Sequence, residues 1–220
     1  MKKLFILFSV LALLAGFAGV STAGIVASAH DFSATGWAHQ QICLPCHTPH
    51  NADTEVQEAP LWNHELSVGP YQMYTSPTMQ AEISVEGPTG VSLLCLSCHD
   101  GTVSLDAFGG NPGTGFFIDN YPGADLTTDL SNDHPISFTY DAALAAADPG
   151  LYDPTVTNVT IGDTNGLSRQ GTITEVMLIN QELQCSSCHS VHNDYVAAGT
   201  ESLLKISDQG SQLCLTCHNK

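Results

Sequence analysis

The amino-acid sequence predicts a chain of mostly irregular loops, with short helices and a small β-hairpin, arranged around four copies of one five-residue motif. Two observations support this prediction. Glycine, proline, aspartate, asparagine and threonine dominate residues 101–135, a composition typical of loops and turns. The pattern C-x-x-C-H occurs four times and uses all eight cysteines of the chain. We therefore expect the motifs to organise the fold.

The four motifs match the attachment signature of c-type haem. Two residues between the cysteines let both sulfurs reach one edge of a porphyrin, and the next histidine can then ligate the iron. The predicted attachment residues are Cys43 and Cys46, Cys95 and Cys98, Cys185 and Cys188, and Cys214 and Cys217. The predicted proximal ligands are His47, His99, His189 and His218. The sequence thus predicts a multihaem cytochrome c wrapped around a chain of four haems.

Zinc binding and disulfide formation are the alternatives to haem attachment. A closed zinc site takes four ligands, which four equal sets of two cysteines and one histidine suit badly. A disulfide framework fits an oxidising compartment but gives no reason for a histidine after every cysteine pair. The repeated histidine therefore favours haem.

The first 23 residues have the character of a signal peptide. Lys2 and Lys3 precede an apolar run, and small residues end at Ala23, where we expect cleavage. The segment 27–29 offers a second cleavage site, and a membrane anchor is the alternative, although the run is short for a spanning helix. We expect an exported chain with no integral membrane segment after cleavage, forming a single domain of residues 24–220. It would reside outside the cell or on its outer surface, or alternatively in the periplasm.

The mature chain is strongly acidic. Loss of Lys2 and Lys3 leaves three cations against 22 acidic residues, a formal charge of −19. Nucleic acid and anionic membranes are therefore excluded as expected partners. The acidity accounts for the solubility of an exported protein. A more specific interpretation is that the acidic surface attracts a basic partner or a mineral surface.

The motif flanks reveal an internal duplication. Residues 43–51 and 185–193 both read C-x-x-C-H-x-x-H-N, whereas residues 92–99 and 211–218 share S-x-L-C-L-x-C-H. The two types alternate along the chain, so a haem pair at 43–99 is repeated at 185–218. We expect similar local haem geometry in the two halves.

Only short regular elements are predicted. Residues 141–147 form a helix, because Asp141 is a good N-cap and the helix stops before Asp148-Pro149-Gly150. The β-branched runs 156–161 and 172–179 form a hairpin. We expect the haem motifs on short helical turns, with nearby leucines beside a porphyrin. The sequon at Asn158 is a chance match unless glycosylation machinery is present.

The second axial ligand decides whether each iron can bind a substrate, since a closed face confines a haem to electron transfer. Six histidines lie outside the motifs. His50 and His192 each follow a proximal histidine by three residues, so they can reach only a neighbouring haem. His134 is held by the following proline, and the near-terminal His30 could reach another subunit. The weaker candidates are His64 and His39, and methionine (Met73, Met79 or Met177) is the minority alternative.

Several segments resemble the multihaem cytochromes of metal-reducing bacteria. They are the opening His30-Asp31-Phe32-Ser33, Pro60-Leu61-Trp62-Asn63, Cys95-Leu96-Ser97-Cys98-His99-Asp100-Gly101, Asp133-His134-Pro135-Ile136-Ser137 and the two C-x-x-C-H-x-x-H segments. The chain looks most like the OmcE-type tetrahaem group. That resemblance implies bis-histidine haems, extracellular filaments and one distal histidine from an adjacent subunit. By it the distal ligands are His30, His50, His134 and His192.

Electron transfer outside the cytoplasm is the function expected from these features, without a catalytic residue. The preferred form is the repeating subunit of a conducting filament, with further copies of itself, other cytochromes or metal oxides as partners. A soluble periplasmic electron shuttle is the alternative. A multihaem reductase with one open haem is less favoured, because the four motifs are alike and spare histidines outnumber the haems.

Overall fold

The computed structural model describes residues 24–56, 59–84, 86–162, 167–198, 200 and 202–220. The predicted signal peptide lies outside these residues. Among the helices in the described ranges, none combines the length and the apolar character needed to cross a membrane.

Short elements separated by long loops make up the fold, as the composition predicts. The helical elements are η1 (Phe32–Ala34), α2 (Gly90–His99), η2 (Ile118–Asn120), α3 (Ala142–Ala147), α4 (Ile173–Val176), α5 (Cys185–Cys188), η3 (Gln209–Ser211) and α6 (Gln212–Cys217). The strands are β1 (Phe138–Thr139), β2 (Asn158–Gly162), β3 (Ser168–Thr172) and β4 (Glu182–Leu183). Even the ten-residue α2 is less than three helical turns.

The strands form two small antiparallel pairs. β1 pairs with β4, and β2 pairs with β3 from Asn158 opposite Thr172 to Gly162 opposite Ser168. The predicted hairpin therefore exists, but its second strand was placed wrongly at 172–179. Thr172 ends β3 and caps α4: its hydroxyl accepts from the Glu175 N–H, and Glu175 accepts from the Thr172 N–H at 2.8 Å. This reciprocal cap outweighs the β-branched composition of the run.

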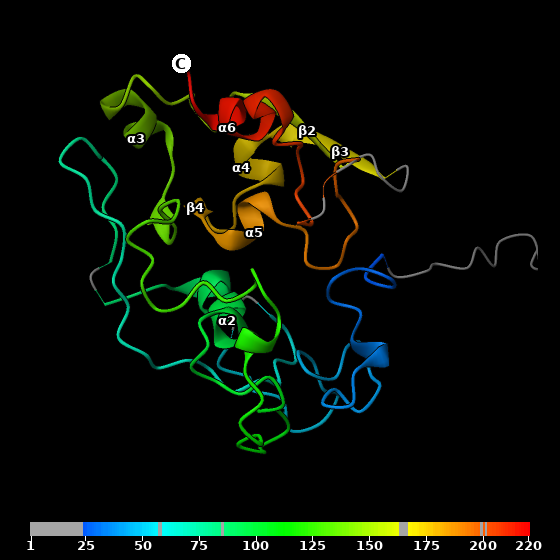
Figure 1. Cartoon of the computed structure of the whole chain (residues 1–220). Helices are drawn as coiled ribbons and strands as arrows, with labels where there is room; N and C mark the ends of the chain where they lie inside the picture. The colour runs from blue at the N-terminus through cyan, green and yellow to red at the C-terminus, as the bar shows by residue number, and fades with distance from the viewer. Residues whose placement is uncertain (1–23, 57–58, 85, 163–166, 199, 201) are drawn as a thin grey trace, which may run out of the picture.

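Figure 1 shows the chain in two halves that meet at α2 and α5. Most of the N-terminal loops form one half with α2, although the loop that contains Ala81 and Ile83 packs against the core of the other half. The helices α3, α4 and α6 and the β2–β3 hairpin form the other. Since α2 carries the second C-x-x-C-H motif and α5 carries the third, the contact between the halves joins the two duplicated haem-pair segments.

The main hydrophobic cluster lies in the C-terminal half. It consists of Phe138, Tyr140, Leu144, Ile161, Ile173, Val176, Met177, Leu178 and Leu183. The predicted helix 141–147 is confirmed, with the Asp141 carboxylate accepting from the Leu144 N–H at 2.8 Å. Met177, named above as a minority candidate for an axial ligand, is part of this cluster and is 3% exposed. The buried apolar side chains of the N-terminal half include Trp62, Leu94, Leu96, Leu105, Phe108 and Ile118.

Replacing Ile173, which is fully buried, with alanine should destabilise the C-terminal half. The cavity and the lost apolar contacts should cost about 2 to 5 kcal/mol of unfolding free energy. Guanidinium denaturation of the haem-loaded protein measures the change. Val156→Ala is the control, because Val156 is 67% exposed, and an equal loss in both variants would contradict the assigned core.

Candidate haem-binding sites

Each C-x-x-C-H motif is wound into a helical turn, as predicted. The second motif ends α2, the third forms α5 and the fourth lies in α6. In the first motif the His47 N–H donates to the Cys43 carbonyl at 2.8 Å, which closes an isolated turn. A helical turn places side chains three residues apart on the same face. Both thiols of each motif therefore lie on one side, as attachment to one porphyrin edge requires.

Three proximal histidines are oriented by the backbone. The Nδ1 atoms of His47, His99 and His189 lie 2.9, 2.7 and 2.6 Å from the carbonyl oxygens of Pro60, Ala124 and Ser202. A carbonyl can only accept, so Nδ1 carries the proton in each ring. This leaves the Nε2 lone pair free to bind a metal, the arrangement by which proteins commonly orient a ligating imidazole.

Three of the four motif histidines, namely His47, His99 and His218, each face a second histidine. The ring centres of His99 and His30 are 6.1 Å apart. His47 and His192 are 6.3 Å apart, as are His218 and His134. Each pair joins a proximal residue to one predicted distal residue, across segments that are distant in the sequence.

The spacing of the pairs fits an iron atom between the rings. With metal–nitrogen bonds of about 2 Å, two imidazoles on opposite sides of one metal have centres about 6 to 6.5 Å apart. The Nδ1 of His30 is buried and has no hydrogen-bond partner among the described residues.

The protonation states around the motifs suit haem attachment. Burial, and then the neighbouring His99, His189 and His192, lower the pKa of His30 to about 4. The imidazole is therefore neutral at pH 7, as metal ligation demands. Burial raises the pKa of Cys46 to about 11 and that of Cys217 to about 12, which keeps these thiols protonated before a haem is attached.

The other spare histidines have different surroundings. His50 is exposed, and among the described residues neither His50 nor His189 has a ring partner like those above. The exposed His39 packs edge-on against Phe108 at 5.8 Å. The buried His64 donates from Nδ1 to the Glu65 carbonyl at 2.8 Å, and its Nε2 lies 3.5 Å from the Cys98 sulfur. His64 thus lines the second attachment site without facing a motif histidine.

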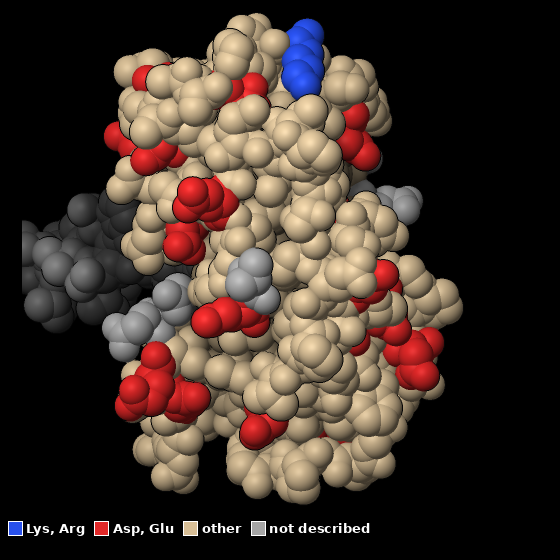
Figure 2. Space-filling view, turned by 90° about the vertical axis from the view of Figure 1, so that its left-hand side faces the viewer, with Lys and Arg blue, Asp and Glu red and all other residues tan. Residues whose placement is uncertain are grey.

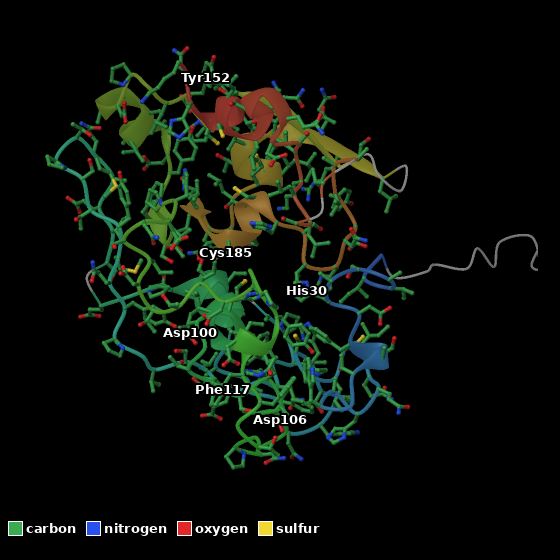
Figure 3. The ribbon with its side chains drawn as sticks, viewed as in Figure 1. His30, Asp100, Asp106, Phe117, Tyr152 and Cys185 are labelled. Atoms are coloured by element: carbon green, nitrogen blue, oxygen red, sulfur yellow. The ribbon has the colours of Figure 1, made fainter. Side chains whose placement is uncertain are left out.

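A buried polar clamp joins the second and third motifs. The Gln184 amide oxygen accepts from the Ser92 N–H, and the Ser92 hydroxyl accepts from the Cys185 N–H, each at 3.0 Å. The thiols of Cys95 and Cys185 contact each other, which raises the pKa of Cys95 and lowers that of Cys185. Figure 3 shows Cys185 where the two halves meet. Sequence reasoning missed this junction, although the Gln184–Ser187 capping box was a readable signal.

Acidic side chains are spread over the molecular surface. Figure 2 shows Asp and Glu at many places on one face, with little basic surface beside them. At the fourth motif, Cys214 is exposed and Leu215 is 46% exposed. The packing of the leucines beside a porphyrin stays a prediction.

The comparison with protein families matches residues 179–220 to the doubled CXXCH motif. The matched segment contains the third and fourth motifs, which form the second of the duplicated pairs. This match supports a multihaem c-type cytochrome. No curated protein matches the chain.

Gln184→Leu should weaken the junction between the second and third motifs. The Ser92 N–H, now buried without its acceptor, should cost about 1 to 3 kcal/mol of unfolding free energy. Chemical denaturation of the haem-loaded protein measures the loss. Gln209→Leu provides the matched control on an exposed residue. Equal stability of the two variants would show that the clamp does not contribute to the unfolding free energy.

Proposed function

We propose that this chain is an exported electron-transfer protein with four covalently bound haems, one at each C-x-x-C-H motif. The observation that carries the proposal is the facing of three motif histidines by a second histidine, at the spacing of two imidazoles on one metal. Each haem supplies a one-electron iron couple. The chain's own residues fix the haem positions and occupy both axial positions of each iron.

Histidine on both faces of an iron leaves no coordination site for a substrate. We assign His192 as the distal partner of His47, His30 as that of His99 and His134 as that of His218. The fourth partner follows from the duplication. Because His192 of the third-motif segment faces His47 of the first, we propose that His50 reciprocates toward His189.

The attachment cysteines support a continuous path for electrons. A cysteine of each motif lies near a cysteine of the next: Cys46 near Cys98, Cys95 near Cys185, and Cys188 near Cys217. Haems bound there would follow one another in the order of the motifs along the sequence. The path would enter at the first motif and leave at the fourth, or run in reverse.

We propose further that copies assemble end to end into a conducting filament outside the cell. Cys43 and Cys214, in the terminal motifs, are exposed. Leu61 and Leu215, at 51% and 46% exposure, provide apolar contact area near them. The partners are then other copies, with further cytochromes or metal oxides at the filament end. The acidity of the chain favours a second candidate, a periplasmic shuttle that docks transiently on basic partners.

Carbon monoxide tests the closed coordination. The reduced wild-type protein should bind none, whereas His192→Ala should keep four attached haems and gain about one carbon monoxide per chain, because His47 loses its facing ligand. Absorption spectra and titration measure both. His39→Ala is the control, since His39 packs against Phe108. One binding site in the wild type would instead indicate an open haem at His189 and favour a reductase.

Assembly is tested by electron microscopy of protein purified without denaturant. We expect long, uniform filaments, and single small particles at every concentration would favour the shuttle. His30→Ala refines the result. Exchange of His30 between subunits predicts loss of filaments with four haems retained. The contact with His99 within the chain predicts intact filaments and one newly open haem.

A further inference from the structure

A buried carboxylate lies beside one of the four proximal histidines. Asp100 directly follows His99, at the C-terminus of α2, and is 4% exposed. Figure 3 labels it in the half of the molecule that contains α2. Asp100 belongs to the segment Cys95–Gly101 that resembles multihaem cytochromes, and the proposed electron path gives it no role.

Neutral groups make all the hydrogen bonds found at this carboxylate in the described structure. One oxygen accepts from the hydroxyls of Ser67 and Tyr71, both at 2.5 Å. The other accepts from the backbone N–H and the hydroxyl of Thr102, both at 2.8 Å. Four donors stabilise the ionised form of a carboxyl group. The Asp100 carboxylate is therefore buried, and the groups that hydrogen-bond to it in the described structure are all uncharged.

The donors are themselves held in place. Ser67 is 4% exposed, and its N–H donates to the hydroxyl of the fully buried Ser97. Burial and then the hydrogen bond to Asp100 raise the pKa of Tyr71, so its hydroxyl stays protonated and continues to donate. The charge consequently has a rigid position beside α2.

The other three motifs lack this feature. The residues that follow their proximal histidines are Thr48, Ser190 and Asn219, all uncharged. The duplication does not reproduce the charge either, since the fourth motif, which is of the same type as the second, has asparagine at the corresponding position. The acidic residue distinguishes one haem site from three otherwise similar sites.

We propose that Asp100 lowers the reduction potential of the haem attached to Cys95 and Cys98. A fixed negative charge stabilises the oxidised iron, which carries one more positive charge than the reduced iron. Burial keeps solvent from screening the interaction. The four haem sites then differ in their electrostatic surroundings, and the second haem has its reduction potential lowered by a buried charge. This inference rests on the proposed function, because it requires a haem at that motif.

Replacement of Asp100 by a neutral residue tests the proposal. In Asp100→Asn the reduced-to-oxidised ratio of the second haem, at a fixed applied potential, should rise about tenfold, with smaller changes at the other three. NMR-monitored redox titration resolves the individual haems. Asp100→Ser introduces the residue type that follows the proximal histidine in the third motif, and it should also raise the reduced-to-oxidised ratio. Agreement of the two variants shows that the rise is not an effect of asparagine itself.

Two controls separate charge from structure. Tyr71→Phe removes a donor but keeps the carboxylate, so the ratio should not rise. Asp129→Asn removes an exposed carboxylate and should have little effect. The Asp100 shift should persist in about 1 M salt, where exposed charges are screened within about 3 Å.

The possible outcomes are distinguishable. Four attached haems with no rise in either Asp100 variant would overturn the inference and leave the proposed function standing. An equal rise in Tyr71→Phe would also overturn it, since a loosened loop would then be the cause. Peptide mass analysis that finds no haem on Cys95 and Cys98 of the wild type would defeat the proposed function itself.

Discussion

Orientation of the motif histidine is the constraint on which the rest of this structure depends. A helical turn puts both thiols on one side, and a backbone carbonyl holds the Nδ1 proton of His47, His99 and His189. The free Nε2 can then point at a metal. The carbonyls belong to Pro60, Ala124 and Ser202, which lie in loops outside the helices and strands.

Different interactions stabilise the two halves and the junction between them. The C-terminal half has a conventional apolar cluster around Ile173 and Met177. The N-terminal half buries apolar side chains that include Trp62, Leu96 and Phe108. The clamp of Gln184 and Ser92 joins the two halves. Haems bound at the motifs would add apolar surface to both halves, since each half carries two of the four motifs.

The departures from the sequence-based expectations have local physical causes. The run 172–179 is β-branched, but Thr172 and Glu175 cap a helix there instead. His64, a weaker candidate from the sequence, lies against Cys98 and donates to a carbonyl, without a motif histidine facing it. His30, near the start of the described chain, lies against His99 of the same chain, and its exchange between subunits stays a prediction.

The sequence by itself determined the haem chemistry, the duplicated pairing of motifs and the scarcity of regular structure, because each depends on residues close together in the chain. Only the tertiary structure decided which histidines face one another, since each pair spans at least 69 residues, from His30 to His99. It also decided that Asp100 is buried among Ser67, Tyr71 and Thr102. Long-range packing, which no spacing rule encodes, creates both environments.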